Sequence, residues 1–296
     1  MATVDLKGGE NSYSPNQRGT MFTPRFDRFF RTHEKVMWQF SSIDFNAIQP
    51  ELLTPGIVEA VRGAMLVESH NPVYTMRILE YYRPDHEMTS FTTTWSYEEL
   101  KHYLVLRTYL EALPSRFITG KDLPTELDET RAGPWGDREM GFTRVQSFTY
   151  AMLQEEITGL AYKRLFEATK EPVLKEISRL IGRDEYRHCQ YYLEKGQEEL
   201  KEDSDRMKEV DETLIGFEFP GPTFVKDYKR YSQVFRGVNK LDFAAVKEVA
   251  GKVSQLTGKK HLLELALSRE GRRTLSDQWG ITPMSIIRAM YSWDKS

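Results

Sequence analysis

Two short segments, Glu99-Leu-Lys-His102 and Glu185-Tyr-Arg-His188, decide how this chain folds. Each lies in a long stretch whose apolar residues recur every three or four positions, the pattern of an amphipathic helix. Residues three apart lie on one face of a helix, so the glutamate and the histidine of a segment can bind the same metal ion. One such segment is common by chance, but two in comparable helices indicate that both segments bind metal.

Two other helical stretches each offer a glutamate on their apolar side, Glu68 and Glu155. Glu68 precedes Glu99 by 31 residues, and Glu155 precedes Glu185 by 30. Such separations bring the residues of an antiparallel helix pair to the same height. We choose Glu155 over its neighbour Glu156 because Glu155 lies on the apolar face of its helix, whereas Glu156 falls about 100° away.

The periodicity predicts four long helical stretches, at about 50–82 with a break at Pro72, 86–113, 142–168 and 171–200. The segment between the second and third stretches is rich in Pro and Gly, which is typical of a long crossover. The sequence therefore predicts an all-α, ferritin-like four-helix bundle with one long crossover, extended by additional shorter helices.

One domain accounts for most of the chain. Residues 1–20 lack an apolar signal core and are interpreted as a mobile N-terminal arm. Residues 21–296 are expected to form a single domain, with the core bundle at about 50–200 and the C-terminal helices at about 205–296.

Composition excludes several classes of protein. The 41 Lys and Arg residues against 44 Asp and Glu give a net charge of -3, which argues against a nucleic-acid partner. The single cysteine, Cys189, excludes an internal disulfide and a cysteine-rich metal site. Charged residues interrupt every apolar stretch, so no membrane span is expected. These observations favour a protein of the cytoplasm.

Six residues form the predicted metal site. Four carboxylates and two imidazoles suit two divalent, redox-active cations. Asp184, adjacent to one ligand, is a candidate partner for the outer nitrogen of a ligand histidine. The other four histidines have no glutamate at the required spacing and are interpreted as structural: His33, His70, His86 and His261. The predicted ligands are Glu68, Glu99, His102, Glu155, Glu185 and His188.

At these residues the sequence resembles the soluble acyl-[acyl-carrier-protein] desaturases, the stearoyl-ACP desaturase family and its bacterial relatives. The segment from Trp95 to His102 resembles the family's W-x-x-E-E-x-R-H, and Asp184–His188 is similar to its D-E-x-R-H. The resemblance extends to three further segments, which are Glu68–Tyr74 (E-x-x-x-P-x-Y), Gln154–Thr158 (Q-E-x-x-T) and Leu267–Arg272 (L-S-x-E-G).

The resemblance implies a homodimeric di-iron enzyme that inserts a cis double bond into an acyl chain bound to acyl carrier protein, using O2 and electrons from ferredoxin. It assigns the same six residues as iron ligands. It also implies a proton-relay or oxygen-positioning hydroxyl at Thr158, and a link from His102 through Asp184 to an indole on the electron-entry side, for which Trp38 is the candidate. Trp95 would lie beside the ligands on the other side.

The resemblance further implies an apolar channel for the acyl chain and a basic surface for the acidic carrier protein. Candidate docking clusters are residues 226–240 and the group Arg25, Arg28, Arg31 and Lys35. The channel is expected to be lined by residues such as Met65, Phe148, Met152, Gly159 and Tyr162.

Two alternative functions stay open. The same ligands could serve another di-iron oxidation, such as hydroxylation, N-oxygenation or oxidative cleavage of a carrier-bound or free substrate. A non-enzymatic ferritin-like protein would bind metal without turning over a substrate, although the context of Thr158, Trp95 and Asp184 argues against that function.

Overall fold

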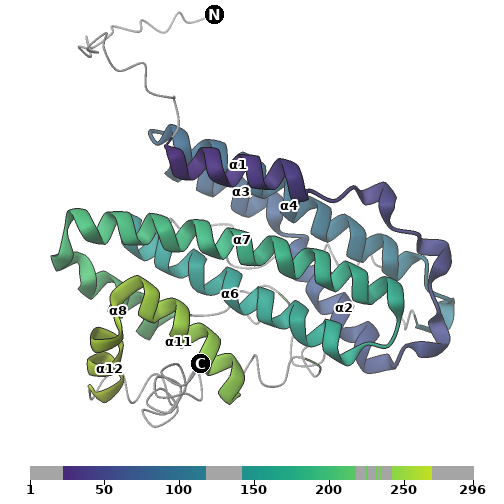
Figure 1. Cartoon of the computed structure of the whole chain (residues 1–296). Helices are drawn as coiled ribbons and strands as arrows, with labels where there is room; N and C mark the ends of the chain where they lie inside the picture. The colour runs from purple at the N-terminus through teal and green to yellow at the C-terminus, as the bar shows by residue number, and fades with distance from the viewer. Residues whose placement is uncertain are drawn as a thin grey trace, which may run out of the picture.

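The computed structural model describes residues 23–117, 142–217 and 242–268, together with Val225, Tyr231 and Val234. Every regular element in these ranges is a helix (Figure 1). Short 3-10 helices lie at Phe40–Ser42, Phe45–Ala47, Pro50–Leu52, Ser115–Phe117 and Ser204–Arg206. The α-helices are α1 Pro24–Val36, α2 Pro55–Glu68, α3 Asn71–Tyr81, α4 His86–Glu111, α6 Arg144–Ala168, α7 Pro172–Glu202, α8 Met207–Gly216, α11 Phe243–Thr257 and α12 Lys259–Leu267.

The bundle consists of two helix pairs. Helices α6 and α7 pack along their length, and α4 packs against α2 and α3, which follow one another after a short break. The pairs meet where α4 contacts α7 and α2 contacts α6, while α11 lies across α6 and α7 (Figure 1). This arrangement confirms the predicted all-α, four-helix bundle.

Local capping explains where the long helices begin. The Asp85 side chain accepts a hydrogen bond from the Met88 amide at the start of α4, and Thr143 forms a capping box with Gln146 at the start of α6. The Glu171 carboxylate accepts two backbone amides at the start of α7. The predicted boundaries agree with these starts to within a few residues.

The first predicted stretch differs most from the structure. Its start, residues 50–52, is a separate 3-10 turn, and α2 begins at Pro55 behind the Thr54 cap. The break expected at Pro72 falls just before it, because a proline is tolerated in the first turn of α3, where its missing amide proton costs nothing.

Helix α1 was not among the predicted helices. Its N-cap Thr23 accepts a hydrogen bond from the Phe26 amide, and Phe26 and Phe29 are buried. The Phe29 ring lies 4.9 Å from that of Phe91 on α4 and 5.1 Å from that of Tyr191 on α7. Aromatic packing therefore fixes α1 against the bundle, and α1 and the segment after it carry His33 and Trp38.

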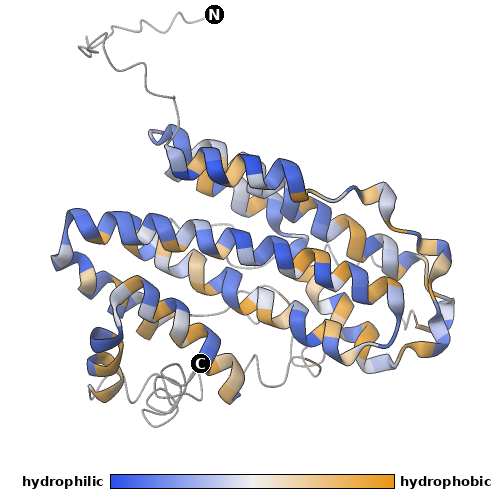
Figure 2. Ribbon diagram, viewed as in Figure 1, coloured by the Kyte–Doolittle hydropathy of each residue, from blue (hydrophilic) through white to orange (hydrophobic). Residues whose placement is uncertain are grey.

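Two glycines let α6 and α7 approach closely at the middle of the bundle. A methyl group added at Gly159 would lie 3.5 Å from Cβ of Glu185, and one at Gly182 would lie 3.4 Å from Cβ of Tyr162. Hydrophobic and hydrophilic residues alternate along the bundle helices (Figure 2), and the apolar ones form one continuous core. Within the described ranges, none of the helices has the length and apolar character that crossing a bilayer requires.

Candidate metal centre

The six predicted ligands come together inside the bundle. Glu68 is the last residue of α2, Glu155 lies on α6, and the two Glu-x-x-His segments lie on α4 and α7. All six side chains are buried. Glu68, Glu99, His102 and Glu185 can each place one ligand atom within 4.8 Å of the others, and so can Glu99, Glu155, Glu185 and His188. Because Glu99 and Glu185 belong to both sets, the geometry is that of two neighbouring metal sites.

Several atoms at the centre have no hydrogen-bond partner in the described part of the chain. They are Nδ1 of His102 and His188 and Oε1 of Glu99 and Glu185. His102 Nδ1 lies 3.3 Å from Glu185 Oε1, and His188 Nδ1 lies 3.2 Å from Glu99 Oε1. Buried polar atoms without partners are costly unless something compensates them. Two divalent cations fit this set, since carboxylate oxygens and imidazole nitrogens are their usual ligands.

The carboxylates affect one another's protonation. Burial and then the nearby Glu185 raise the pKa of Glu68 to about 7, and the same two causes raise that of Glu155 to about 8. Burial also raises the pKa of Glu99 well above its ordinary value. Burial alone would lower the pKa of His102, but hydrogen bonding to Asp184 and Glu185 raises it. The metal-free centre therefore holds protons that metal ions would displace.

Asp184 holds the outer nitrogen of His102, as the sequence predicts. Its Oδ2 lies 3.4 Å from His102 Nε2 and accepts a 2.7 Å hydrogen bond from the Trp38 indole. Arg187 donates to the other carboxylate oxygen at 2.7 Å. The expected chain from Trp38 through Asp184 to His102 is thus present, and all three side chains are buried.

Glu98 plays the same part for His188, and the sequence analysis missed it. Its Oε2 lies 2.8 Å from His188 Nε2, while Oε1 accepts from Arg187 and lies 3.0 Å from His33 Nδ1. His33, interpreted from the sequence as structural, thus contacts the acid that holds a ligand histidine. The signal was available in the sequence, since an acid precedes the glutamate in both metal-binding segments.

Two further side chains donate directly to ligands. The Trp95 indole donates to Glu155 Oε1 at 3.1 Å, as expected for a residue beside the ligands. The Tyr162 hydroxyl donates to Glu68 Oε1 at 2.6 Å, so this tyrosine contacts a ligand. Thr158 is half-buried one turn after Glu155, and its role stays a prediction.

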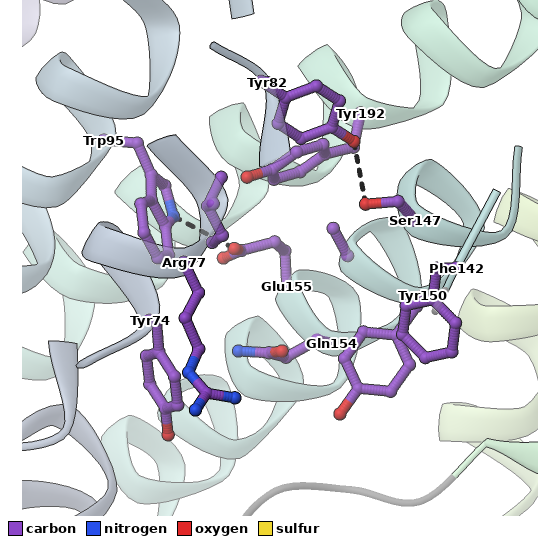
Figure 3. A pocket seen from close by; sticks show the side chains of 12 residues that line it. Tyr74, Arg77, Tyr82, Trp95, Phe142, Ser147, Tyr150, Gln154, Glu155 and Tyr192 are labelled. Carbon is purple, nitrogen blue, oxygen red and sulfur yellow. Dashed lines mark hydrogen bonds between the residues drawn. The ribbon is translucent and has the colours of Figure 1, made fainter. Parts of the chain in front are cut away.

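An apolar pocket reaches the centre from between α3 and α6 (Figure 3). The cavity measures about 60 Å³. Tyr82 donates a 2.8 Å hydrogen bond to Ser147 at one side, while Arg77 and Gln154 lie at another. The five residues expected to line the channel do not line this pocket; Met65, Phe148 and Met152 are fully buried in the core. The lining is Tyr74, Arg77, Ile78, Tyr82, Trp95, Phe142, Ser147, Tyr150, Ala151, Gln154, Glu155 and Tyr192.

The three arginines of the basic cluster on α1 form ion pairs with acids of the same chain. Arg25 lies 2.6 Å from Glu87 and 3.1 Å from Glu198. Arg28 and Arg31 are also paired, with Glu194 at 2.6 Å and Asp27 at 2.7 Å. Apart from Tyr231 and Val234, the second expected docking cluster, residues 226–240, lies outside the described residues.

The fold and the buried carboxylate and histidine ligands define a ferritin-like protein with a site suited to two metal ions. Residues 44–273 match the family model described as fatty acid desaturase. The chain belongs to this family. Comparison with curated protein sequences finds no match. Membership and ligands together support an oxidoreductase of the ferritin-like, two-metal type.

Solved structures with the same fold include two variants of an R2-like ligand-binding oxidase, each with an anaerobically reconstituted Mn/Fe cofactor. The first has a TM-score of 0.54 and 18% identity over 79% of this chain and 94% of its own. The second has a TM-score of 0.50 and 16% identity, and the match covers 92% of this chain and 93% of the oxidase chain. These similarities support the ferritin-like fold.

Proposed function

We propose that the protein is a di-iron, O2-dependent desaturase that introduces a cis double bond into an acyl chain bound to acyl carrier protein. The observation that carries the proposal is the double ligand set, with two shared glutamates, placed where an apolar pocket ends at Glu155. Family membership supports the substrate class. The proposal includes a homodimer and a ferredoxin or similar electron donor.

Desaturation consumes one O2 molecule for each double bond formed. The acyl chain loses two hydrogen atoms, a donor supplies two electrons, two protons enter, and O2 leaves as two water molecules. Two irons held by the six ligands would supply the oxidising power that unactivated C–H bonds require, because side chains alone cannot oxidise them. The protein itself binds, orients and excludes water.

The residues around the ligands divide these tasks. Asp184 and Glu98 hold the outer nitrogens of the two ligand histidines, which fixes the direction of their metal-facing Nδ1 atoms. Trp38, hydrogen-bonded to Asp184, is the proposed point of electron entry. Trp95 orients Glu155 beside the pocket, and the Thr158 hydroxyl is the proposed proton donor.

The experiment is anaerobic loading with ferrous iron, followed by O2 with palmitoyl- or stearoyl-carrier protein and reduced ferredoxin. Two irons per chain and an acyl product that lacks two hydrogen atoms are expected. Glu155→Ala should abolish the product, whereas Glu80→Gln, an exposed acid on α3, should not. A loaded enzyme that returns every acyl chain unchanged would refute the desaturase.

A second candidate is another oxidation at the same centre, such as hydroxylation or N-oxygenation of a carrier-bound or free substrate. The small apolar pocket favours the free-substrate form of this reaction, since about 60 Å³ suits a small molecule better than a long acyl chain. Gain of one oxygen atom in the product would identify this reaction. Full metal loading without any product would instead favour a non-enzymatic ferritin-like protein.

A further inference from the structure

A second cavity also reaches the ligand Glu155. It measures about 300 Å³, lies between α6 and α7, and extends to Glu248 on α11. Glu155 lines both this cavity and the apolar pocket. One ligand is therefore reached by two separate routes, and the lining of the second includes charged side chains.

Gly159 and Gly182 line this second cavity at a close contact between α6 and α7. Both line the cavity at the place where α6 and α7 approach most closely to the ligands. The Cβ of the ligand Glu185 lies only 3.5 Å from where a side chain on Gly159 would start. Larger residues here would press against the facing helix next to the metal centre.

Carboxylates mark the route from the surface inward. Glu248 is exposed at the mouth, Glu156 is buried deeper, and Glu155 belongs to the centre. Glu156 has no ion pair within 4 Å among the described residues, and its hydrogen bond comes from the weak Cys189 thiol donor at 3.4 Å. Two basic residues also line the cavity, and both are paired: Lys163 lies 4.0 Å from Glu248 and Arg179 lies 2.6 Å from Glu176. The buried Lys252 attracts Glu156 electrostatically without an ion pair within 4 Å.

Ser178 points independently to a polar occupant. Its side chain is only 1% exposed, lines the cavity, and has a hydroxyl without a hydrogen-bond partner among the described residues. Such a group normally finds a partner. A water molecule or the hydration shell of an ion passing through the cavity would provide one.

We propose that this cavity is the route by which hydrated divalent metal ions enter the centre, while the apolar pocket serves the organic substrate. The proposal rests on the metal centre of the proposed function but not on desaturation. Carboxylates at the mouth and halfway along attract cations, and the cavity of about 300 Å³ has room for the water molecules around them. The separation allows metal loading without passage through the substrate pocket.

The test is the rate of cobalt(II) uptake by the metal-free full-length protein, followed by absorption in a stopped-flow instrument. Ser178→Leu, which fills the cavity, should slow uptake about tenfold, because a close-packed side chain leaves little space for a hydrated ion. Glu248→Gln should slow it about threefold at low salt and less at high salt, because the attraction at the mouth is screened. The final amount of bound metal should not change in either variant.

Two control variants make the result specific. Glu34→Gln removes an exposed acid on α1, and Ala151→Phe narrows the apolar pocket; neither should alter the uptake rate. Wild-type rates in both Ser178→Leu and Glu248→Gln would overturn the proposal, and so would slow uptake in Ala151→Phe. If Ser178→Leu fails to fold, Glu248→Gln on the surface decides the matter. Desaturation can fail while this result stands, because no acyl substrate is present.

Discussion

Each ligand histidine is held by an acid from the other Glu-x-x-His helix. Glu98 on α4 contacts His188 on α7, and Asp184 on α7 contacts His102 on α4. The exchange is reciprocal, so the two helices fix each other's ligands. Partners of this kind set the direction and basicity of the imidazole.

Removing either acid's charge should therefore weaken metal binding. Asp184→Asn keeps the size of the side chain and is expected to reduce affinity for metal by about 10- to 100-fold. Glu98→Gln should do the same through His188. Cobalt(II) titration monitored by absorption measures this, with Glu80→Gln as the control. Wild-type affinity in both variants would show that the outer acids do not support the ligands.

Metal binding should release protons from the ligand carboxylates. More protons should be released per metal ion at about pH 6 than at about pH 9. The pKa of Glu68 is raised to about 7 and that of Glu155 to about 8, so both are largely protonated at about pH 6 and ionised at about pH 9. Metal affinity should therefore rise with pH across this range. A weakly buffered solution with a pH indicator measures the protons; equal release at both pH values would contradict the expectation.

The ligands could be predicted because their spacing is a local property of a helix. Glu99 and His102 lie three residues apart, and this alone places them on one face. The walls of the apolar pocket could not be predicted in the same way, because they depend on how far apart α3 and α6 lie. Tyr82 and Ser147 meet across 65 positions of sequence.

The start of α7 is secured by a buried carboxylate. Glu171 accepts the amides of Val173 and Leu174, and also the hydroxyl of Tyr109 on α4 at 2.8 Å. It is fully buried, unlike the Thr143 cap of α6. This cap therefore joins two helices as well as ending one.

Glu171→Ala should destabilise the protein by about 2 to 4 kcal/mol, because it removes a cap and leaves the buried Tyr109 hydroxyl without its acceptor. Thr143→Ala, at the more exposed cap, should cost about 1 kcal/mol. Urea unfolding followed by circular dichroism measures the free energy of unfolding for both. Equal losses would show that burial of the Glu171 cap is unimportant.

Helix positions followed from periodicity, since α4, α6 and α7 all lie close to their predicted ranges. Helix α1 was not predicted because its 13 residues give a shorter periodic pattern than the long stretches do. Its local signals, the Thr23 cap followed by Pro24, were present in the sequence. Its place on the bundle was not predictable locally, because Phe29 packs against residues 62 and 162 positions away.

Helix α1 lies outside the four-helix bundle, yet it packs on α4 and α7 and contacts Glu98 through His33. A chain that begins at residue 21 should unfold at the same temperature as the full chain and bind the same metal. A chain that begins at residue 38 should unfold at a lower temperature and bind metal more weakly, because Phe29 no longer covers Phe91 and His33 no longer contacts Glu98. Thermal unfolding and metal titration of both chains test this. Identical behaviour would mean that α1 is dispensable.

Arg187 gives the two metal sites a shared support. It donates to Asp184 and to Glu98, the acids that hold the histidines of the two sites. If the Arg187 guanidinium shifts when an ion binds at one site, it also shifts the acid that holds the histidine of the other site. We therefore expect cooperative loading: the first ion would order the support that the second ion needs, and a metal titration should show few half-filled centres.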